Sequence, residues 1–329
     1  MWPPLIVDTG VECERDTDSR NLLEDEFSVV SVVGQGTTSY VQHAVRRSDS
    51  CHVALKTLRV EDEHMISVAK EEYEMLRTIA HPNIVRALDF IAAPCRAVLV
   101  LEFFNGRDLL QTVSSMPEQC LPEIVAMPLT TMLADAVVYL HSRRVTHRDI
   151  KPQNVLASSD LKHLKLVDFN VARNLQEGLA LTPTGTRLYA APEVIFGEPP
   201  SELSDIWAVG LCAHLLLSGK LPQGREGCDS LKETIQVCAK REVTLQGHPW
   251  TKVSTQCKSV LRRCLAAEPS KRLLSMAALL QGCSAWVSAG CCGTRSRSMP
   301  SPEVVSRHAA HCLPKKRCLS RSYHSIKAL

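Results

Sequence analysis

The sequence has no long uninterrupted hydrophobic run and no export signal. The most apolar stretch, residues 209–217, is shorter than the roughly 18 residues that span a bilayer, and His214 interrupts it. The apolar start, residues 1–7, has no basic residue and is followed by acidic ones, unlike a secretory signal peptide. We therefore expect no membrane span and a cytoplasmic location.

A large excess of charge of one sign is also lacking. The net charge is +3 over 329 residues, so a strongly basic surface for nucleic acid is not expected. The 14 cysteines are scattered over a long chain, a pattern that favours reduced thiols over a disulfide framework. The His and Cys residues near the C-terminus form no tight Cys-x-x-Cys pair, so no zinc site is expected there.

What charge there is gathers at the two ends. Residues 1–26 hold eight acidic and two basic residues, and residues 287–329 hold eight basic and one acidic. Periodicity is lost from about residue 289, where Cys, Ser, Arg and Pro dominate. We expect an acidic N-terminal extension at 1–26, a folded domain at 27–286 and a basic flexible tail at 287–329. The basic run 315–317 is the only hint of a nuclear alternative.

The folded part has two halves with different patterns. Strand-like runs dominate 27–104, interrupted by one helical segment at 63–79 in which apolar residues recur at three and four. After residue 104 the pattern becomes helical, with long apolar-periodic segments at 125–140 and 204–218. Shorter helices are expected at 258–265 and 275–281. The fold class is therefore α+β, with a small strand-rich part before a larger helical one.

A glycine-rich turn, Gly34-Gln35-Gly36, lies between two of the strand-like runs. Two glycines let backbone amides approach a phosphate closely. A plain hairpin is the alternative interpretation. Because a strand follows the turn, it is not a dinucleotide-binding fingerprint, which requires a helix there.

Lys56 ends an apolar strand-like run at 53–55. Its ammonium requires a polar environment, and two interpretations are open. Either the side chain reaches solvent along the surface, or it binds phosphate oxygens while a helix carboxylate holds it. Glu72, in the predicted helix 63–79, is the expected carboxylate.

The segment 147–154 is more specific. It places two acceptors, Asp149 and Asn154, and two cations, Arg148 and Lys151, within eight residues. Such polar crowding between apolar segments suits neither a core nor a solvated face. Asp168 then follows a short apolar strand at 164–167, before a loop rich in threonine.

Taken together, these motifs resemble the eukaryotic protein kinases. Seven features occur in the order typical of that family, over about residues 27–286. They are the glycine-rich turn, Lys56, His147-Arg148-Asp149, Asp168-Phe169, Ala191-Pro192-Glu193, Asp205-Ile206-Trp207 and Arg272. The resemblance implies a bilobal fold, with a β-rich N-lobe at 27–104 and an α-helical C-lobe at 105–286. The general layout is similar to the calcium/calmodulin-dependent group.

The resemblance implies transfer of the γ-phosphoryl group of ATP, with Mg2+ as the second cofactor, to Ser or Thr hydroxyls of protein substrates. Lys56 would contact the α/β-phosphates, with Glu72 holding its ammonium. Asp168 and Asn154 would bind the metals. Asp149 would accept the proton of the substrate hydroxyl, and Lys151 would contact the γ-phosphate.

The same resemblance implies a nucleotide site and two bracing contacts. The site would comprise Gly34, Gln35, Gly36, Val41, Ala54, Lys56, Glu102, Phe104, Asp108 and Leu156, with Leu101 as gatekeeper. Asp205 would brace the catalytic loop, and Glu193 would pair with Arg272.

The loop before Ala191 is expected to regulate the kinase. By resemblance, Arg148 would bind a phosphate on Thr182, with Thr184 as the second choice, which implies an upstream activating kinase. Thr186 and the segment 151–154, which is Lys-Pro-Gln-Asn, match the Ser/Thr type rather than the tyrosine type. A plain polar loop is the alternative for the threonines.

One departure from the family pattern sustains a rival hypothesis. Asn170 stands where the family has the Gly of Asp-Phe-Gly. Asn tolerates positive φ better than most residues, so Asp168 is still expected to bind metal. The alternatives are a pseudokinase that binds nucleotide as a scaffold, and a kinase-fold enzyme acting on small molecules, against which the segment 185–193 argues.

Overall fold

The computed structural model describes residues 23–36, 39–60, 63–93, 96–169, 188–222 and 243–272. All of them belong to one unit, Met1–Gly290. Asn170, Thr182, Thr184, Thr186 and the predicted helix 275–281 lie outside the described residues. So do nearly all of the predicted acidic extension and the whole of the basic tail, and the expectations for these segments stay predictions.

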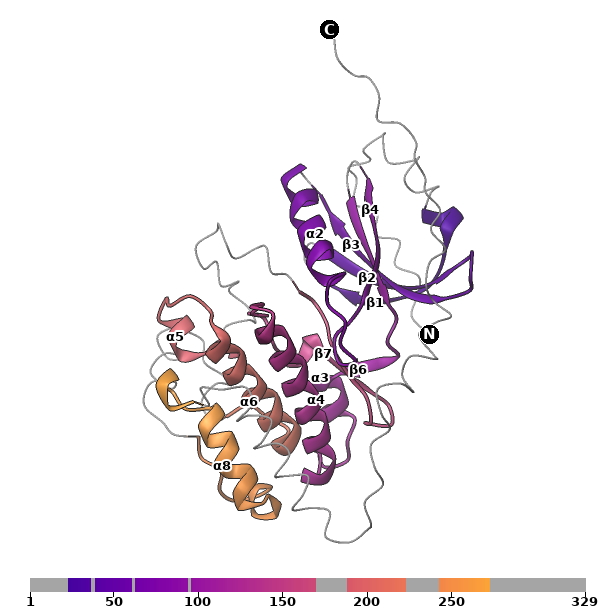
Figure 1. Cartoon of the computed structure of the whole chain (residues 1–329). Helices are drawn as coiled ribbons and strands as arrows, with labels where there is room; N and C mark the ends of the chain where they lie inside the picture. The colour runs from indigo at the N-terminus through magenta and orange to yellow at the C-terminus, as the bar shows by residue number, and fades with distance from the viewer. Residues whose placement is uncertain are drawn as a thin grey trace, which may run out of the picture. The chain divides into compact units, whose positions relative to one another are not determined.

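The N-terminal part is a five-stranded antiparallel sheet with the order β1-β2-β3-β5-β4 (Figure 1). Its strands are β1 (Phe27–Gln35), β2 (Ser39–Arg46), β3 (His52–Arg59), β4 (Ala87–Ala93) and β5 (Arg96–Glu102). The central strands β3 and β5 are buried over most of their length, and the interior of β5 is a continuous apolar run. This sheet confirms the predicted β-rich N-lobe.

One long helix, α2 (Glu63–Leu76), packs against β4 and β5. Ala69, Tyr73 and Leu76 recur on the face that joins the core. The helix ends earlier than predicted. The amides of Thr78 and Ile79 donate three residues back, so the chain tightens into a turn after Leu76 instead of continuing as α-helix to 79.

Helices dominate the C-terminal part, as predicted. They are α3 (Leu109–Ser114), α4 (Glu123–Ser142), α5 (Pro192–Ile195), α6 (Glu202–Ser218) and α8 (Thr255–Cys264), with 3-10 turns at Pro152–Asn154, Trp250–Lys252 and Pro269–Lys271. The helix α6 contacts both α4 and α8 (Figure 1). It is buried nearly all round, which its apolar sequence requires.

The helix α4 is the only helix of the described residues long and apolar enough to cross a membrane. Its sequence is not one unbroken apolar run, because Glu123, Pro128 and Asp135 interrupt it. Half of its residues are buried against the protein core. Its hydrophobicity is therefore accounted for by the packing of the C-lobe.

A small second sheet carries residues of the expected site. It consists of β6 (Gly106–Asp108), β7 (Val155–Ser158) and β8 (Leu164–Leu166), in that order. The segment after α2 is bonded to β8: Val85 N donates to Leu166 O (3.0 Å) and Leu166 N to Asn83 O (2.8 Å). These bonds connect the N-terminal and C-terminal parts.

Candidate active site

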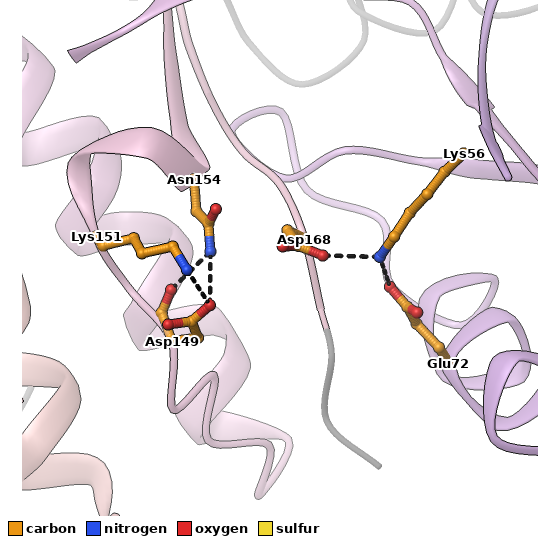
Figure 2. Close-up of polar contacts among 6 residues, drawn as sticks. All are labelled: Lys56, Glu72, Asp149, Lys151, Asn154 and Asp168. Atoms are coloured by element: carbon orange, nitrogen blue, oxygen red, sulfur yellow. Dashed lines mark hydrogen bonds and ion pairs between the residues drawn. The ribbon is translucent and has the colours of Figure 1, made fainter. Parts of the chain in front are cut away.

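Lys56, Glu72 and Asp168 come together from a strand, a helix and the end of β8 (Figure 2). Lys56 Nζ lies 2.9 Å from Glu72 Oε1 and 2.7 Å from Asp168 Oδ1. The Lys56 and Glu72 side chains are almost fully buried. The alternative of a solvated surface lysine is therefore wrong.

Burial and charge oppose each other in this cluster. Burial acts to lower the pKa of Lys56, but the carboxylates of Glu72 and Asp168 outweigh it, so this pKa is raised. Burial likewise opposes ionisation of Asp168, but Lys56 outweighs it and the pKa of Asp168 is lowered. For Glu72, burial is the stronger effect and the pKa is raised despite Lys56. Burial and the neighbouring charges therefore act in opposite directions on the pKa of all three groups.

Asp149, Lys151 and Asn154 form a second cluster in the segment before β7 (Figure 2). Lys151 Nζ donates to Asp149 Oδ2 (2.7 Å). Asn154 Nδ2 donates to Asp149 O (2.9 Å) and to Asp149 Oδ2 (3.1 Å). One oxygen of the Asp149 carboxylate, Oδ2, therefore accepts from both Lys151 and Asn154, and the Asp149 side chain is about a quarter exposed.

Asp205, at the start of α6, fixes the backbone before Asp149. Its carboxylate accepts from His147 N (2.9 Å) and Arg148 N (2.9 Å), which confirms the predicted brace. Asp205 also accepts from His141 Nε2 (2.8 Å), a contact that the sequence analysis missed. A histidine in an apolar helix was the available signal, because a buried imidazole needs a partner.

Two backbone positions near the site are strained. Arg148 has φ 68° and Asp168 has φ 66°, both in the left-handed region that non-glycine residues seldom adopt. Phe169 is fully buried, its ring meets His147 edge-on at 4.6 Å, and its amide donates to Glu72. These contacts hold Asp168 in the orientation that faces Lys56.

Strand register places the residues expected around a nucleotide. Val41 pairs with Lys56, and Ala54 pairs with Leu101, so the four lie together on the sheet. Gly34 and Gln35 end β1, Gly36 follows it, and Leu156 lies on β7. Asp108 serves in addition as the N-cap of α3, accepting from Gln111 N at 2.8 Å.

Glu102 and Phe104 lie where β5 leads into the second sheet. The side chain of Glu102 contacts Lys165 of β8, a residue that the sequence analysis did not single out. Lys165 gave no sequence signal beyond one charge in an alternating strand. Glu193 and Arg272 form the predicted pair, with two bonds of 2.6 Å each.

The donor set fits a hard divalent cation. Asp168 supplies carboxylate oxygens, and Asn154 bonds through its amide nitrogen, so in the described part of the chain its amide oxygen is left for another ligand. No group of three or more His, Cys, Asp or Glu residues with metal-binding geometry occurs among the described residues. Mg2+ needs no such group, since it binds one or two protein oxygens and takes the rest from water and phosphate.

The chain is similar to known proteins over most of its length. A family model described as "Protein kinase domain" matches residues 27–282. The "Putative ribosomal protein S6 kinase alpha-2" of Caenorhabditis elegans is 32% identical over 265 residues, which are 75% of this chain and 34% of the relative. "Serine/threonine-protein kinase ULK3" of Homo sapiens is 33% identical over 256 residues, 76% of this chain and 52% of the relative.

A third relative, "Serine/threonine-protein kinase H1" of Homo sapiens, is 29% identical over 260 residues, 77% of this chain and 60% of the relative. The chain thus spans between about a third and three fifths of the length of these relatives.

Proposed function

Because this chain belongs to the protein kinase domain family, whose model matches most of it, we propose that it is an active serine/threonine protein kinase that uses ATP and Mg2+. The named relatives are kinases, two of them of the serine/threonine type. We propose Ser or Thr hydroxyls of proteins as acceptors. The cytoplasmic location stays a prediction.

One observation carries the proposal: Lys56 contacts Glu72 and Asp168 at the same time. Phosphoryl transfer in this family requires the strand lysine to be paired with the helix carboxylate and the metal-binding aspartate to be in place beside it. A scaffold that only binds nucleotide has no need of it. The arrangement therefore favours the active enzyme over the pseudokinase alternative.

Each side chain then has a step to perform. Asp149 orients the substrate hydroxyl and takes its proton as the oxygen attacks the γ-phosphorus. The bond between that phosphorus and the bridging oxygen breaks, and ADP leaves. Lys151, 2.7 Å from Asp149, stabilises charge on the γ-phosphate, and Lys56 does so at the α/β-phosphates.

Asp168 and Asn154 would hold the metal. When bound, Mg2+ neutralises charge that develops on the phosphate oxygens. The chain itself contributes the position of Asp168, which Lys56 and the buried Phe169 fix. It also contributes the position of Asn154, which bonds Asp149 and so joins the metal ligand to the proton acceptor.

The resemblance of the segment 151–154 to the Ser/Thr type supports Ser or Thr as the acceptor. Gln153 Nε2 donates to Tyr189 Oη (3.3 Å), which links the catalytic segment to the segment before α5. With Thr186 nearby in sequence, this segment matches the Ser/Thr type. An upstream kinase acting on Thr182, with Arg148 receiving the phosphate, remains part of the proposal.

The test is radiolabel transfer from Mg-ATP to a mixed protein substrate. We expect label on Ser and Thr, and a loss of about 10²- to 10⁴-fold in Asp149→Asn, because the proton acceptor is removed. Asp160→Asn is the matched control, since Asp160 is exposed on the β7–β8 turn, and it should transfer normally.

Nucleotide binding and the identity of the labelled product separate the active protein kinase from its two alternatives. If the wild type binds ADP but transfers no phosphate, even with Thr182→Glu, the pseudokinase hypothesis replaces this proposal. Asn170 would then be the cause of the missing activity. Label on a small molecule but on no protein would favour the third class instead.

A further inference from the structure

Glu102 is held at a point where three segments meet. Its Oε1 accepts from Lys165 Nζ (2.5 Å) and from Arg86 N (2.9 Å), while its own amide donates to Arg86 O (2.9 Å). The side chains of Lys165 and Glu102 are 16% and 25% exposed. The pair is therefore partly buried and has a defined geometry, unlike an exposed ion pair that contributes little.

Lys165 also contacts the segment after α2. Its Nζ donates to Ile84 O (3.2 Å), and Ile84 bridges to Leu166. One ammonium thus joins β8, the 84–86 segment and the end of β5. Among the described residues, Lys56–Asp168 is the other ion pair that joins the N-terminal sheet to the end of β8.

The position of the pair relates it to the expected adenine site. Glu102 begins the segment 102–106, here called the hinge segment, whose backbone would bind the adenine edge by the resemblance to protein kinases. Lys165 pairs in register with Leu156, which by the same resemblance would lie below the adenine. A displacement of Glu102 would move the backbone that reads the base.

We propose that Lys165 is a positioning residue for nucleotide binding, acting through Glu102 to fix the hinge segment. The inference rests on the proposed function and deepens it. Lys165 touches no reacting atom; it holds a carboxylate whose own backbone faces the base.

The first test uses the protein without nucleotide. Hydrogen exchange of the peptide 99–106 should be at least about fivefold faster in Lys165→Met than in the wild type, because the ion pair that restrains local opening of the hinge segment is lost. Lys165→Arg should restore the slow rate. Lys162→Met is the matched control, since Lys162 is exposed close by in the chain and should leave exchange unchanged. Unchanged exchange in Lys165→Met would overturn the proposal.

The second test is ADP affinity by calorimetry. Lys165→Met and Glu102→Gln should each lower the affinity for ADP by roughly fivefold. The double variant should bind ADP no more weakly than either single variant, since both substitutions remove the same ion pair. The affinity for purine riboside diphosphate, which lacks the 6-amino group, should fall less in these variants than the affinity for ADP. Equal losses for both nucleotides, or tighter ADP binding, would contradict a role through the hinge backbone.

Kinetics separate this inference from the proposed function. Lys165→Met should raise KM for ATP and leave kcat within about twofold, as expected when binding alone is lost. A fall in kcat at unchanged KM would contradict positioning of the nucleotide. Absence of transfer in the wild type would count against the proposed function only, because the exchange test requires no catalysis.

Discussion

At the scale of single residues, Gly106 shows how closely the hinge segment approaches its surroundings. A Cβ at this position would lie 2.5 Å from Phe104 Cε1 and 2.6 Å from Ala157 O. The second neighbour is backbone of β7 and does not move easily. Gly106 therefore lets the end of the hinge segment continue into β6 and pair with β7.

Gly106→Ala should lower the free energy of unfolding by about 1–3 kcal/mol, because the added methyl overlaps packed atoms. Gly34→Ala is the control. A Cβ there would meet only Val41 at 3.7 Å, an ordinary contact, and should change stability by less than about 0.5 kcal/mol. Urea denaturation measures the stability of both variants. A Gly106→Ala variant as stable as the wild type would show that the backbone of β7 shifts at Ala157 to make room.

At the scale of elements, Arg272 ties the segment that follows α8 to α5 and α6. Its side chain is fully buried, bonds both oxygens of Glu193, donates to Leu203 O (3.0 Å) and lies 5.0 Å over the Trp207 ring. A buried guanidinium requires a carboxylate, since an unpaired charge in this place would be costly. The pair therefore fixes α5 to the segment that follows α8.

Glu193→Gln should destabilise the fold by about 3–5 kcal/mol, because Arg272 would then be buried without a counter-charge. Glu268→Gln is the matched control: Glu268 pairs with Lys271, both side chains are more than half exposed, and the expected loss is below about 1 kcal/mol. Thermal unfolding measures both. A loss in Glu193→Gln as small as in the control would mean that water replaces the carboxylate.

The sequence predicted the elements whose signal is local. The helices α4 and α6 follow from apolar spacing, and Lys56 with Glu72 follows from motif order. The strand β4 was missed because its Ala-rich sequence has little β preference, and it exists through pairing with β5. Lys165 and Glu102 could not be paired in advance, because only the fold brings their distant chain segments together.

At the scale of the whole molecule, buried histidines make stability depend on pH. His214 is buried on α6, donates from Nδ1 to Lys220 O (2.8 Å) and packs against Trp250. Burial lowers its pKa from 6.5 to about 4. The unfolded chain therefore takes up a proton below about pH 6.5 that the folded chain refuses until about pH 4.

The free energy of unfolding should thus fall by about 2 kcal/mol from His214 alone between pH 7 and pH 5, on the basis of the shift in its pKa. His214→Gln should lose that part of the pH dependence, whatever its stability at pH 7. Urea titrations at both pH values give the comparison. An identical pH dependence in the two proteins would mean that His214 titrates normally when folded.

The bonds between the 83–85 segment and β8 anchor the chain beyond the C-terminal end of α2. Along the helix axis, Glu72 lies four residues, or about 6 Å, from the last residue, Leu76, whereas Glu63 lies about 20 Å from it. If α2 turned by about 30° about its C-terminal end, Glu72 would move roughly 3 Å and the N-terminal end about 10 Å. Such a movement would break the 2.9 Å bond between Lys56 Nζ and Glu72 Oε1, so the ion pair holds only while the N-terminal end of α2 keeps its place on the sheet.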